Sequence, residues 1–407
     1  MPLLSQRLVG AVTTLACLCC GRLAMAEFSD FRALFVNRFE YAKSSASINA
    51  IMQQAADLGI TDVMFQVRGR ADAFYDSAFE PKADNVPAGF DPLQTAVDAA
   101  HSRGLKLHAW MNTMPIWNST TLPTSPNHVF YNTDPSFRIE YLDGSLEPPA
   151  GSGGGYSIAN PILPEVHTHI NNVVNDIASN YDVDGIHLDY IRYVSGNNFN
   201  NLPHDDQSHA MFLAATGLDG ANSANAAAYK NFIEQRITDL VGTLGNTVDA
   251  AETATGRTID YSASVWRDPD IGEADYMQDY RTWLENDLLD IVMPMIYLSS
   301  SNDSLFNPNL LNSLNVSSNS RVVPTIGTYL HTATAGGPEL TVSQLQRADQ
   351  LGADGAALYG YTALFNDSLA AARREAITAF YESLVPAGSS LRRRASPRRR
   401  SRRFRGR

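Results

Sequence analysis

Cysteine is nearly missing from this chain of 407 residues, which has three, all within the first 20 positions. They are Cys17, Cys19 and Cys20. If that segment is removed, the remaining chain has no thiol. Disulfides, thiolate metal sites and a cysteine nucleophile are then excluded from it.

Long hydrophobic runs are also missing, apart from one at the N-terminus. Arg7 precedes an apolar stretch at residues 8–20, and Ala24-Met25-Ala26 forms a small-residue cleavage site. This order is typical of a secretory signal, so we predict a signal peptide at residues 1–26, cleaved near Ala26. The protein is then secreted or periplasmic and has no membrane span. A frayed helix is one alternative, and a lipoprotein acylated at Cys17 is another.

Positive charge is scarce in the body of the chain. Of 31 basic residues, two lie in the predicted signal and ten in residues 392–407, which leaves 19 against 43 acidic ones, about −24. Such a body repels nucleic acid, so we expect no nucleic-acid partner. The arginine-rich residues 386–407 indicate a disordered tail, which either attaches to an anionic surface or is dispensable.

Between these ends, residues 27–385 alternate short apolar runs with helical patterns, as βαβ units do. The predicted strands cover residues 32–38, 62–68, 106–112, 185–190, 259–266, 290–297, 321–327 and 355–361. The predicted helices cover residues 46–58, 92–103, 164–180, 224–244, 275–285, 308–314, 342–351 and 368–384. Long loops at 113–163 and 194–223 interrupt the series. Since no glycine-rich phosphate motif follows the first strand, we predict a (β/α)8 TIM barrel rather than a doubly wound sheet.

The C-terminal ends of the predicted strands are unusually polar, and in a barrel these ends carry the active site. Their residues are Asn37, Arg38, Glu40, Gln66, Arg68, Asp72, Asn112, Asp189, Arg192, Trp266, Arg267, Asp268, Tyr297, Tyr359 and Tyr361.

Counting by twos along the strands predicts which side chains face the barrel interior. An inward Asp189 implies an inward His187, and an inward Asn112 implies inward Trp110 and His108. Arg68 likewise implies Gln66. A satisfied polar core layer explains the histidines and Gln66 as well as function does, but it explains an inward Asp189 poorly.

Aromatic side chains near carboxylates favour sugar binding, because pyranose rings stack on aromatic faces and their hydroxyls bind carboxylates, amides and guanidinium groups. The candidates are Trp110, Trp117, Trp266, Tyr297 and Tyr361. For each residue alone, packing in the core is the alternative.

The run Asp-Val-Asp-Gly-Ile-His-Leu-Asp-Tyr-Ile-Arg-Tyr at residues 182–193 resembles the strand-four motif of the bacterial glycosyl hydrolase-like family ten. Weaker matches in the same order include Gln66-Val67-Arg68, residues 107–112 and residues 290–297. Together they span about residues 31–365. The resemblance implies a (β/α)8 barrel exported to the cell envelope and hydrolysis of a glycan. Members of that family include a hydrolase of peptidoglycan strands.

Glycosidases generally use two carboxyl groups, one protonating the leaving oxygen and the other attacking the anomeric carbon or activating water. We predict Asp189 as nucleophile or base, kept ionised by Arg192 and His187. Glu40 and Asp268 rank equally as its partner, followed by Asp72. The predicted substrate contacts are Arg68, Asp72, His108, Trp110, Asn112, His187, Arg192, Trp266, Tyr297 and Tyr361.

Other chemistries lack their motifs in this sequence. There is no G-x-S-x-G elbow and no H-E-x-x-H, and His167 and His169 point to different faces of a helix, so we predict no metal and no cofactor. We expect a monomer acting on a polysaccharide or oligosaccharide. Retention or inversion stays open. A non-catalytic glycan-binding barrel and a lyase or transglycosylase are the alternatives.

Overall fold

A computed structural model describes residues 28–41, 44–151, 155–193, 198–300, 303–317 and 319–384 of the chain. The predicted signal peptide at 1–26 and the predicted tail at 386–407 lie outside these residues. No described helix is both long and apolar enough to cross a membrane.

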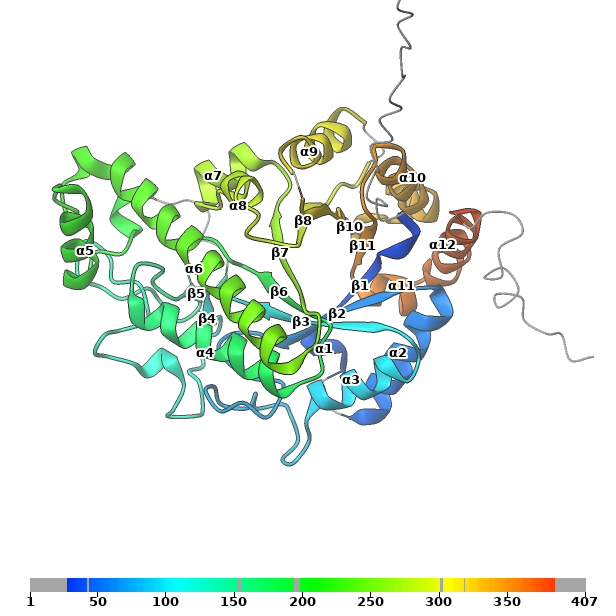
Figure 1. The fold of residues 1–407 in the computed structure, drawn as a ribbon, viewed down its shortest axis with the longest axis horizontal. Helices are drawn as coiled ribbons and strands as arrows, with labels where there is room; N and C mark the ends of the chain where they lie inside the picture. The colour runs from blue at the N-terminus through cyan, green and yellow to red at the C-terminus, as the bar shows by residue number, and fades with distance from the viewer. Residues whose placement is uncertain are drawn as a thin grey trace, which may run out of the picture.

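Eight parallel strands close into a ring, and their order around the ring follows the chain (Figure 1). The seventh strand is in two pieces, β9 and β10, on either side of Pro324, which has no N–H to give to the ladder. The ring closes where β11 pairs with β1, so the predicted (β/α)8 barrel is confirmed. The strands are β1 (Arg32–Val36), β2 (Asp62–Arg68), β3 (Lys106–Asn112), β6 (Gly185–Asp189), β7 (Asp260–Trp266), β8 (Ile291–Ile296), β9 (Arg321–Val322), β10 (Thr325–Gly327) and β11 (Ala356–Tyr359).

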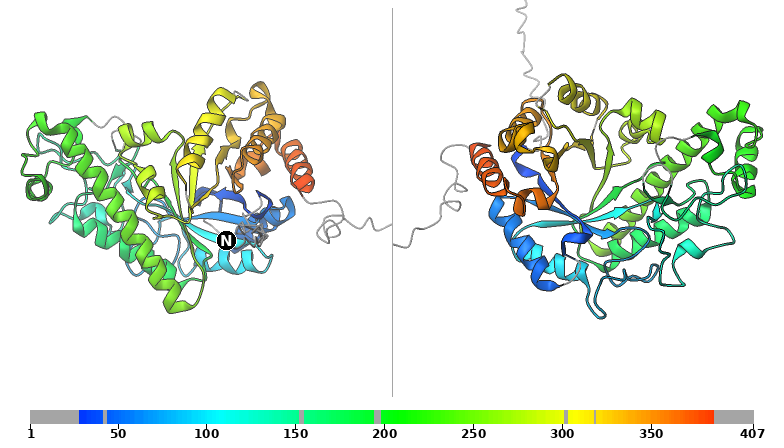
Figure 2. Two further views of the ribbon diagram at one scale, coloured as in Figure 1. Left: turned by 45° about the horizontal axis from the view of Figure 1, so that its top comes forward. Right: turned by 180° about the vertical axis from the view of Figure 1, so that it is seen from behind.

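Helices surround this ring (Figures 1 and 2). They are α1 (Arg38–Tyr41), α2 (Ser45–Leu58), α3 (Pro92–His101), α4 (Pro164–Asn180), α5 (Asp206–Thr216), α6 (Ala226–Thr255), α7 (Pro269–Tyr276), α8 (Tyr280–Glu285), α9 (Asp303–Val316), α10 (Gly337–Gln350), α11 (Tyr361–Phe365) and α12 (Ala370–Leu384).

Local capping chemistry sets several helix boundaries. The Asp91 carboxylate accepts from the N–H of Gln94 at the start of α3, where Pro92 occupies the first turn. Helix α2 ends at Gly59, whose φ of 82° suits glycine. These are the boundaries that the sequence predicts.

The long loops contain structure that the sequence did not predict. The loop after β3 holds an antiparallel pair, β4 (Pro115–Trp117) and β5 (Ser157–Ile158). The predicted loop at 194–223 contains α5, which buries only Ser208 and Phe212. Helix α6 continues well beyond the predicted end at Leu244. Gly245 lets it approach β7, since a Cβ there would lie 3.3 Å from the Tyr261 ring.

The barrel interior is filled by alternate strand residues. An apolar cluster there includes Phe35, Met64, Trp110 and Met293. The outward residues pack against the helices and form the larger core. The interior is therefore a packed core, and ligand chemistry is confined to its C-terminal end.

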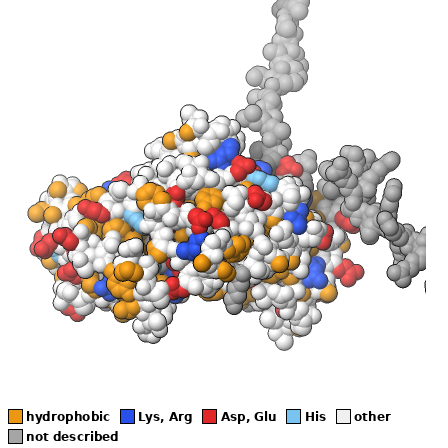
Figure 3. All heavy atoms as spheres, turned by 90° about the horizontal axis from the view of Figure 1, so that it is seen from below, with side chains coloured by type: hydrophobic (Ala, Val, Ile, Leu, Met, Phe, Trp, Pro, Cys, Tyr) orange, Lys and Arg blue, Asp and Glu red, His pale blue; other side chains and the backbone are white. Residues whose placement is uncertain are grey.

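Exposed large apolar side chains are unevenly distributed among the described residues. All ten lie between a barrel strand and the outer helix that follows it, or, for Leu305, in the first turn of that helix. They are Phe39, Phe79, Leu122, Tyr131, Leu142, Leu213, Leu218, Ile271, Leu305 and Tyr329. On the face in Figure 3, apolar side chains are interspersed with acidic and basic ones.

Candidate active site

The Asp189 side chain lies at the C-terminal end of β6, opposite Asn112 of β3. It shares its strand face with His187, whose ring meets Phe35 inside the barrel, and it is only 9% exposed. Burial raises the pKa of the Asp189 carboxyl, against the lowering effects of Arg192, the Tyr190 N–H at 2.7 Å and the Trp110 side chain. The Trp110 indole N–H makes no hydrogen bond of ordinary geometry, so we attribute its effect to proximity.

The raised pKa of Asp189 has a chemical consequence. A carboxyl that keeps its proton to higher pH is suited to donating it. This favours a proton-donating role over the expected role as nucleophile or base.

Three tyrosine rings stand together beside Asp189. Tyr297 and Tyr359 are stacked with centroids 5.6 Å apart, and Tyr329 lies 5.9 Å from each. Burial, and then the Asp189 charge, raises the pKa of Tyr297 and of Tyr359, so both hydroxyls lie within electrostatic reach of that carboxyl. Tyr329 is half exposed and continues this tyrosine platform toward solvent. Such a platform suits stacking against a sugar ring.

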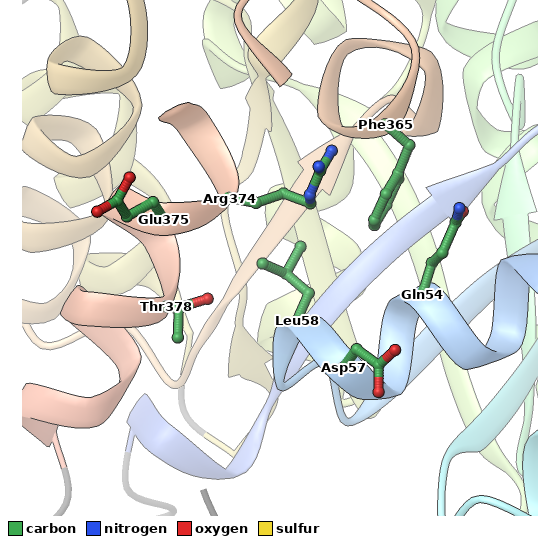
Figure 4. A pocket seen from close by; sticks show the side chains of 7 residues that line it. All are labelled: Gln54, Asp57, Leu58, Phe365, Arg374, Glu375 and Thr378. Carbon is green, nitrogen blue, oxygen red and sulfur yellow. The ribbon is translucent and has the colours of Figure 1, made fainter. Parts of the chain in front are cut away.

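Tyr361, the predicted substrate contact on this strand, is placed elsewhere. It begins α11, stacks on Phe365 and donates its hydroxyl to Gln54 of α2 at 2.5 Å. Gln54 and Phe365 line a pocket of about 300 Å3 between α2, α11 and α12, on the flank of the barrel (Figure 4). The structure thus places Tyr361 beside Gln54 and Phe365, while Tyr359 stands in the tyrosine cluster next to Asp189.

The guanidinium group of Arg192 lies in a cage of aromatic rings. Its central carbon is 4.6 Å from the Tyr276 ring centroid, 4.7 Å from that of Tyr190 and 5.7 Å from that of Trp266. Trp266 and Tyr276 also pack together, with centroids 4.4 Å apart. Arg192 lowers the pKa of Asp189, as predicted, but forms no ion pair with it within 4.0 Å among the described residues.

The two histidines predicted to contact substrate lie below the site. His187 is fully buried, and its ring nitrogens each lie 2.9 Å from a serine hydroxyl, those of Ser262 and Ser264. Burial lowers its pKa to about 3, so it is neutral and does not hold Asp189 ionised. His108 pairs at 2.9 Å with Asp62, the first residue of β2, in the N-terminal half of the barrel. Both are corrected to core residues.

Asn112 and Gln66 connect the ends of three strands. The Gln66 amide donates to the Asn112 oxygen at 3.0 Å, and Asn112 donates to the Gly69 carbonyl at 3.0 Å. Gln66 in turn accepts from the backbone and the guanidinium of Arg38, which also reaches the Tyr156 hydroxyl at 3.4 Å. Asn112 thus fixes the floor of the site and positions Arg38 above it.

Arg68 is held in a buried ion pair. Its guanidinium donates twice to Glu80, from Nε and from Nη2, and also to the backbone carbonyls of Asn112 and Thr113. His169 of α4 joins them, 2.9 Å from Glu80. Despite the cost of burial, Arg68 and His169 lower the pKa of Glu80 to about 2. The structure therefore gives Arg68 a role in fixing loops, in place of the predicted sugar contact.

Asp72 is likewise engaged within the β2–α3 loop. It accepts from the Arg70 backbone at 2.9 Å and pairs with the Arg70 guanidinium at 3.3 Å. That guanidinium lies 3.7 Å from the ring centroid of Trp117. This cluster borders the loop that carries β4.

The two candidate partner carboxylates have different surroundings. Glu40 accepts from the backbone of Asn37 at 2.8 Å and from the backbone and hydroxyl of Thr362 at 3.1 and 3.0 Å. Burial raises its pKa, and these donors oppose the rise. Asp268 caps α7 by accepting from the Asp270 N–H at 3.0 Å. Only Glu40 is connected to Asp189 through a shared neighbour, because both charges raise the pKa of Tyr359.

Several residues of the site received no predicted role: Arg38, Tyr156, Tyr190, Tyr276, Tyr329 and Tyr359. Arg38 and Tyr359 were recognised as polar strand ends, and Tyr190 directly follows one, so position along the chain could have indicated its place in the site. Tyr156, Tyr276 and Tyr329 arrive on loops and short helices, where no local pattern marks them. Among the described residues, no group of three His, Cys, Asp or Glu side chains is placed to hold a metal.

Comparison with known proteins agrees with the resemblance found in the sequence. The family model described as glycosyl hydrolase-like 10 matches residues 33–334. The glycosyl hydrolase DigH of Escherichia coli (strain K12) is 30% identical over 270 residues, which is 59% of this chain and 55% of DigH. The glycosyl hydrolase YngK of Bacillus subtilis (strain 168) is 24% identical over 271 residues, 61% of this chain and 48% of YngK. The chain thus spans about half the length of the curated relatives it matches.

Solved structures show the same fold. The glycoside hydrolase domain of PgaB (BpsB) from Bordetella bronchiseptica aligns with a TM-score of 0.64 at 15% identity, covering 85% of this chain and 98% of that one. The catalytic domain of a beta-amylase from Paenibacillus polymyxa aligns with a TM-score of 0.59 at 13% identity, covering 89% and 100%. At these identities the likeness concerns the barrel alone.

Proposed function

Because this chain belongs to the glycosyl hydrolase-like 10 family, we propose that it hydrolyses O-glycosidic bonds of a bacterial polysaccharide. Peptide-free peptidoglycan strands are the first candidate substrate. The observation that carries the proposal is the inward carboxyl of Asp189, whose pKa burial raises, beside the tyrosine platform. Glycosidic cleavage uses such a protonatable carboxyl together with a second carboxylate.

In this proposal Asp189 donates its proton to the leaving oxygen. Glu40 is the preferred second carboxylate, because Tyr359 lies within reach of both charges. Its three hydrogen-bond donors limit the rise in its pKa that burial causes. Glu40 would then attack the anomeric carbon or take a proton from the attacking water. Asp268 ranks below it, since its carboxylate caps α7.

The places of the other side chains around Asp189 suggest their contacts with the sugar. Tyr297, Tyr359 and Tyr329 would stack on the sugar, while Trp266 and Arg192 would border it on the β7 side. Trp110 lies under Asp189, and Asn112, Arg68 and Asp72 would hold the surrounding loops. These assignments are supported by the hydrogen bonds and ring contacts of the cluster.

The test is release of reducing ends from peptide-free peptidoglycan strands by the purified protein. Hydrolysis that disappears in Asp189→Asn supports the proposal. Tight binding without any cleavage would favour a glycan-binding barrel instead. Unsaturated or anhydro-sugar products would favour a lyase or transglycosylase.

We also propose export, on the basis of the N-terminal sequence pattern. Mass spectrometry of the protein from its host should find an N-terminus near Glu27. A retained Met1 on the accumulated protein would contradict export by cleavage.

A further inference from the structure

We propose that Arg192 recognises a carboxylate group on the sugar that binds beside Asp189, and hence that the substrate is an acidic glycan. The inference rests on the proposed glycosidase function and adds the chemical class of its substrate. It also assigns Arg192 as the residue that determines this specificity.

The first observation is that the guanidinium group of Arg192 has no acceptor. Its Nε is buried without a hydrogen-bond partner, and no described residue accepts from its other nitrogens or pairs with it. The buried arginine Arg68 differs, because its guanidinium donates to Glu80 from both Nε and Nη2. A desolvated donor without an acceptor is costly, and a bound ligand would remove that cost.

The second observation is that the Arg192 side chain is held in place. Tyr190, Tyr276 and Trp266 surround the guanidinium, which favours stacking and fixes its plane. The backbone is anchored on both sides. Gln278 donates to the Ile191 carbonyl at 3.2 Å, and the Tyr193 N–H donates to the Tyr276 carbonyl at 2.7 Å. A fixed planar fork of donors is suited to bidentate binding of a carboxylate.

The third observation is the chemistry of the neighbouring groups. The indole N–H of Trp266 is also buried without a hydrogen-bond partner. The site therefore offers donors in excess, and the missing ligand must supply acceptors. One guanidinium balances the single charge of a carboxylate. A phosphate monoester would be less suited, because it brings a larger charge close to Asp189.

Carboxylate binding at Arg192 would also change Asp189. The positive charge of Arg192 lowers the pKa of that carboxyl in the free protein. A bound carboxylate neutralises this charge, so Asp189 would hold its proton to higher pH once the substrate is in place. An acidic sugar would thus secure the protonated state of the proposed acid on binding.

The experiment compares three glycans with wild-type protein, Arg192→Gln and Arg192→Lys. They are peptide-free peptidoglycan strands, the same strands with their lactyl carboxylates reduced to alcohols, and a polyuronate. Comparison with the polyuronate shows whether Arg192 binds a lactyl carboxylate or a carboxylate on the sugar ring. Arg236→Gln, which removes a charge from the outer helix α6, is the matched control.

Wild-type protein should prefer one acidic glycan over the reduced strands. Arg192→Gln should raise the KM for that glycan about 10- to 100-fold, the range of a charged hydrogen-bonded pair, and change the reduced strands less than about threefold. Arg192→Lys should recover part of the loss. With the acidic glycan, the activity should also fall at alkaline pH in both pH profiles. The fall in kcat, which reports the complex, should lie at higher pH than the fall in kcat/KM, which reports the free protein.

Two results would overturn the inference. One is equal use of acidic and reduced strands by wild-type protein. The other is a loss of activity in Arg192→Gln by the same factor on acidic and on reduced strands. That result would mean that Arg192 acts only through Asp189. If no glycan is cleaved, the hydrolase proposal fails separately. Calorimetric affinities of wild-type and Arg192→Gln protein for the same three glycans would then decide the carboxylate preference.

Discussion

Replacing Asp189 by asparagine is the sharpest perturbation of this site, because it removes the proton and keeps the shape. General acid catalysis typically contributes 10²- to 10⁴-fold, or about 3–5 kcal/mol. We expect kcat on a natural glycan to fall by that factor. Aryl glycosides with good leaving groups need little protonation, so on them the loss should shrink to about tenfold or less.

The same substitution makes an independent prediction about stability. Burial raises the pKa of Asp189 in the folded protein, so the ionised carboxylate destabilises the fold at pH values above that pKa. Asparagine cannot ionise. The variant should therefore be as stable as wild type or more stable at pH 8, and the difference should shrink as the pH falls toward about 4. Urea unfolding across this range measures it.

The matched control is Asp249→Asn on the exposed face of α6, which should leave both activity and stability unchanged. Undiminished activity in folded Asp189→Asn would show that another carboxyl catalyses the reaction. A loss that good leaving groups fail to rescue would make Asp189 the nucleophile instead of the acid.

Three further predictions follow from the surroundings of the site. Glu40→Gln should lower kcat at least 100-fold while Asp268→Asn changes it less than about tenfold, in the reducing-end assay; the reverse order would exchange their roles. Tyr359→Leu should raise KM roughly 3- to 10-fold through lost stacking, whereas Tyr361→Phe should leave KM unchanged and cost about 1 kcal/mol of unfolding free energy. Glu80→Gln should destabilise the fold by about 3–5 kcal/mol at pH 7, because it leaves Arg68 buried without its partner. Since the Glu80 pKa is lowered from 4.5 to about 2, its contribution of about 3 kcal/mol is present above pH 4.5 and lost as the pH falls toward 2; an undiminished difference between variant and wild type through that window would refute the assignment.

The sequence predicts the boundaries of a strand or helix correctly where strong local signals mark its ends. The boundaries of β2, β3 and α4 agree with prediction to the residue, because turn residues or a helix-starting proline border each apolar run. Helix α5 went unpredicted because it buries only Ser208 and Phe212 and so lacks an apolar stripe.

The sequence does not reveal how deep a side chain lies along its strand. It also does not reveal which distant segments of the chain come into contact. Counting by twos placed His108 and Asn112 on one face, yet four residues of strand separate them by about 13 Å, and only the upper one reaches the site. Tyr361 was predicted at the end of the eighth strand, but β11 ends at Tyr359 and α11 begins at Tyr361. The pairing of Arg68 with Glu80 and His169 joins three separate segments, and no local pattern encodes it.

The uneven distribution of exposed apolar side chains gives the molecule a preferred orientation at an interface. Within the part of the chain that the structure describes, all ten exposed large hydrophobic residues lie on segments that follow the C-terminal ends of the strands, and Asp189 lies at such an end. On meeting an insoluble polymer, the protein would gain most by turning this end toward it. A molecule adsorbed in this orientation would already present Asp189 to the polymer chains.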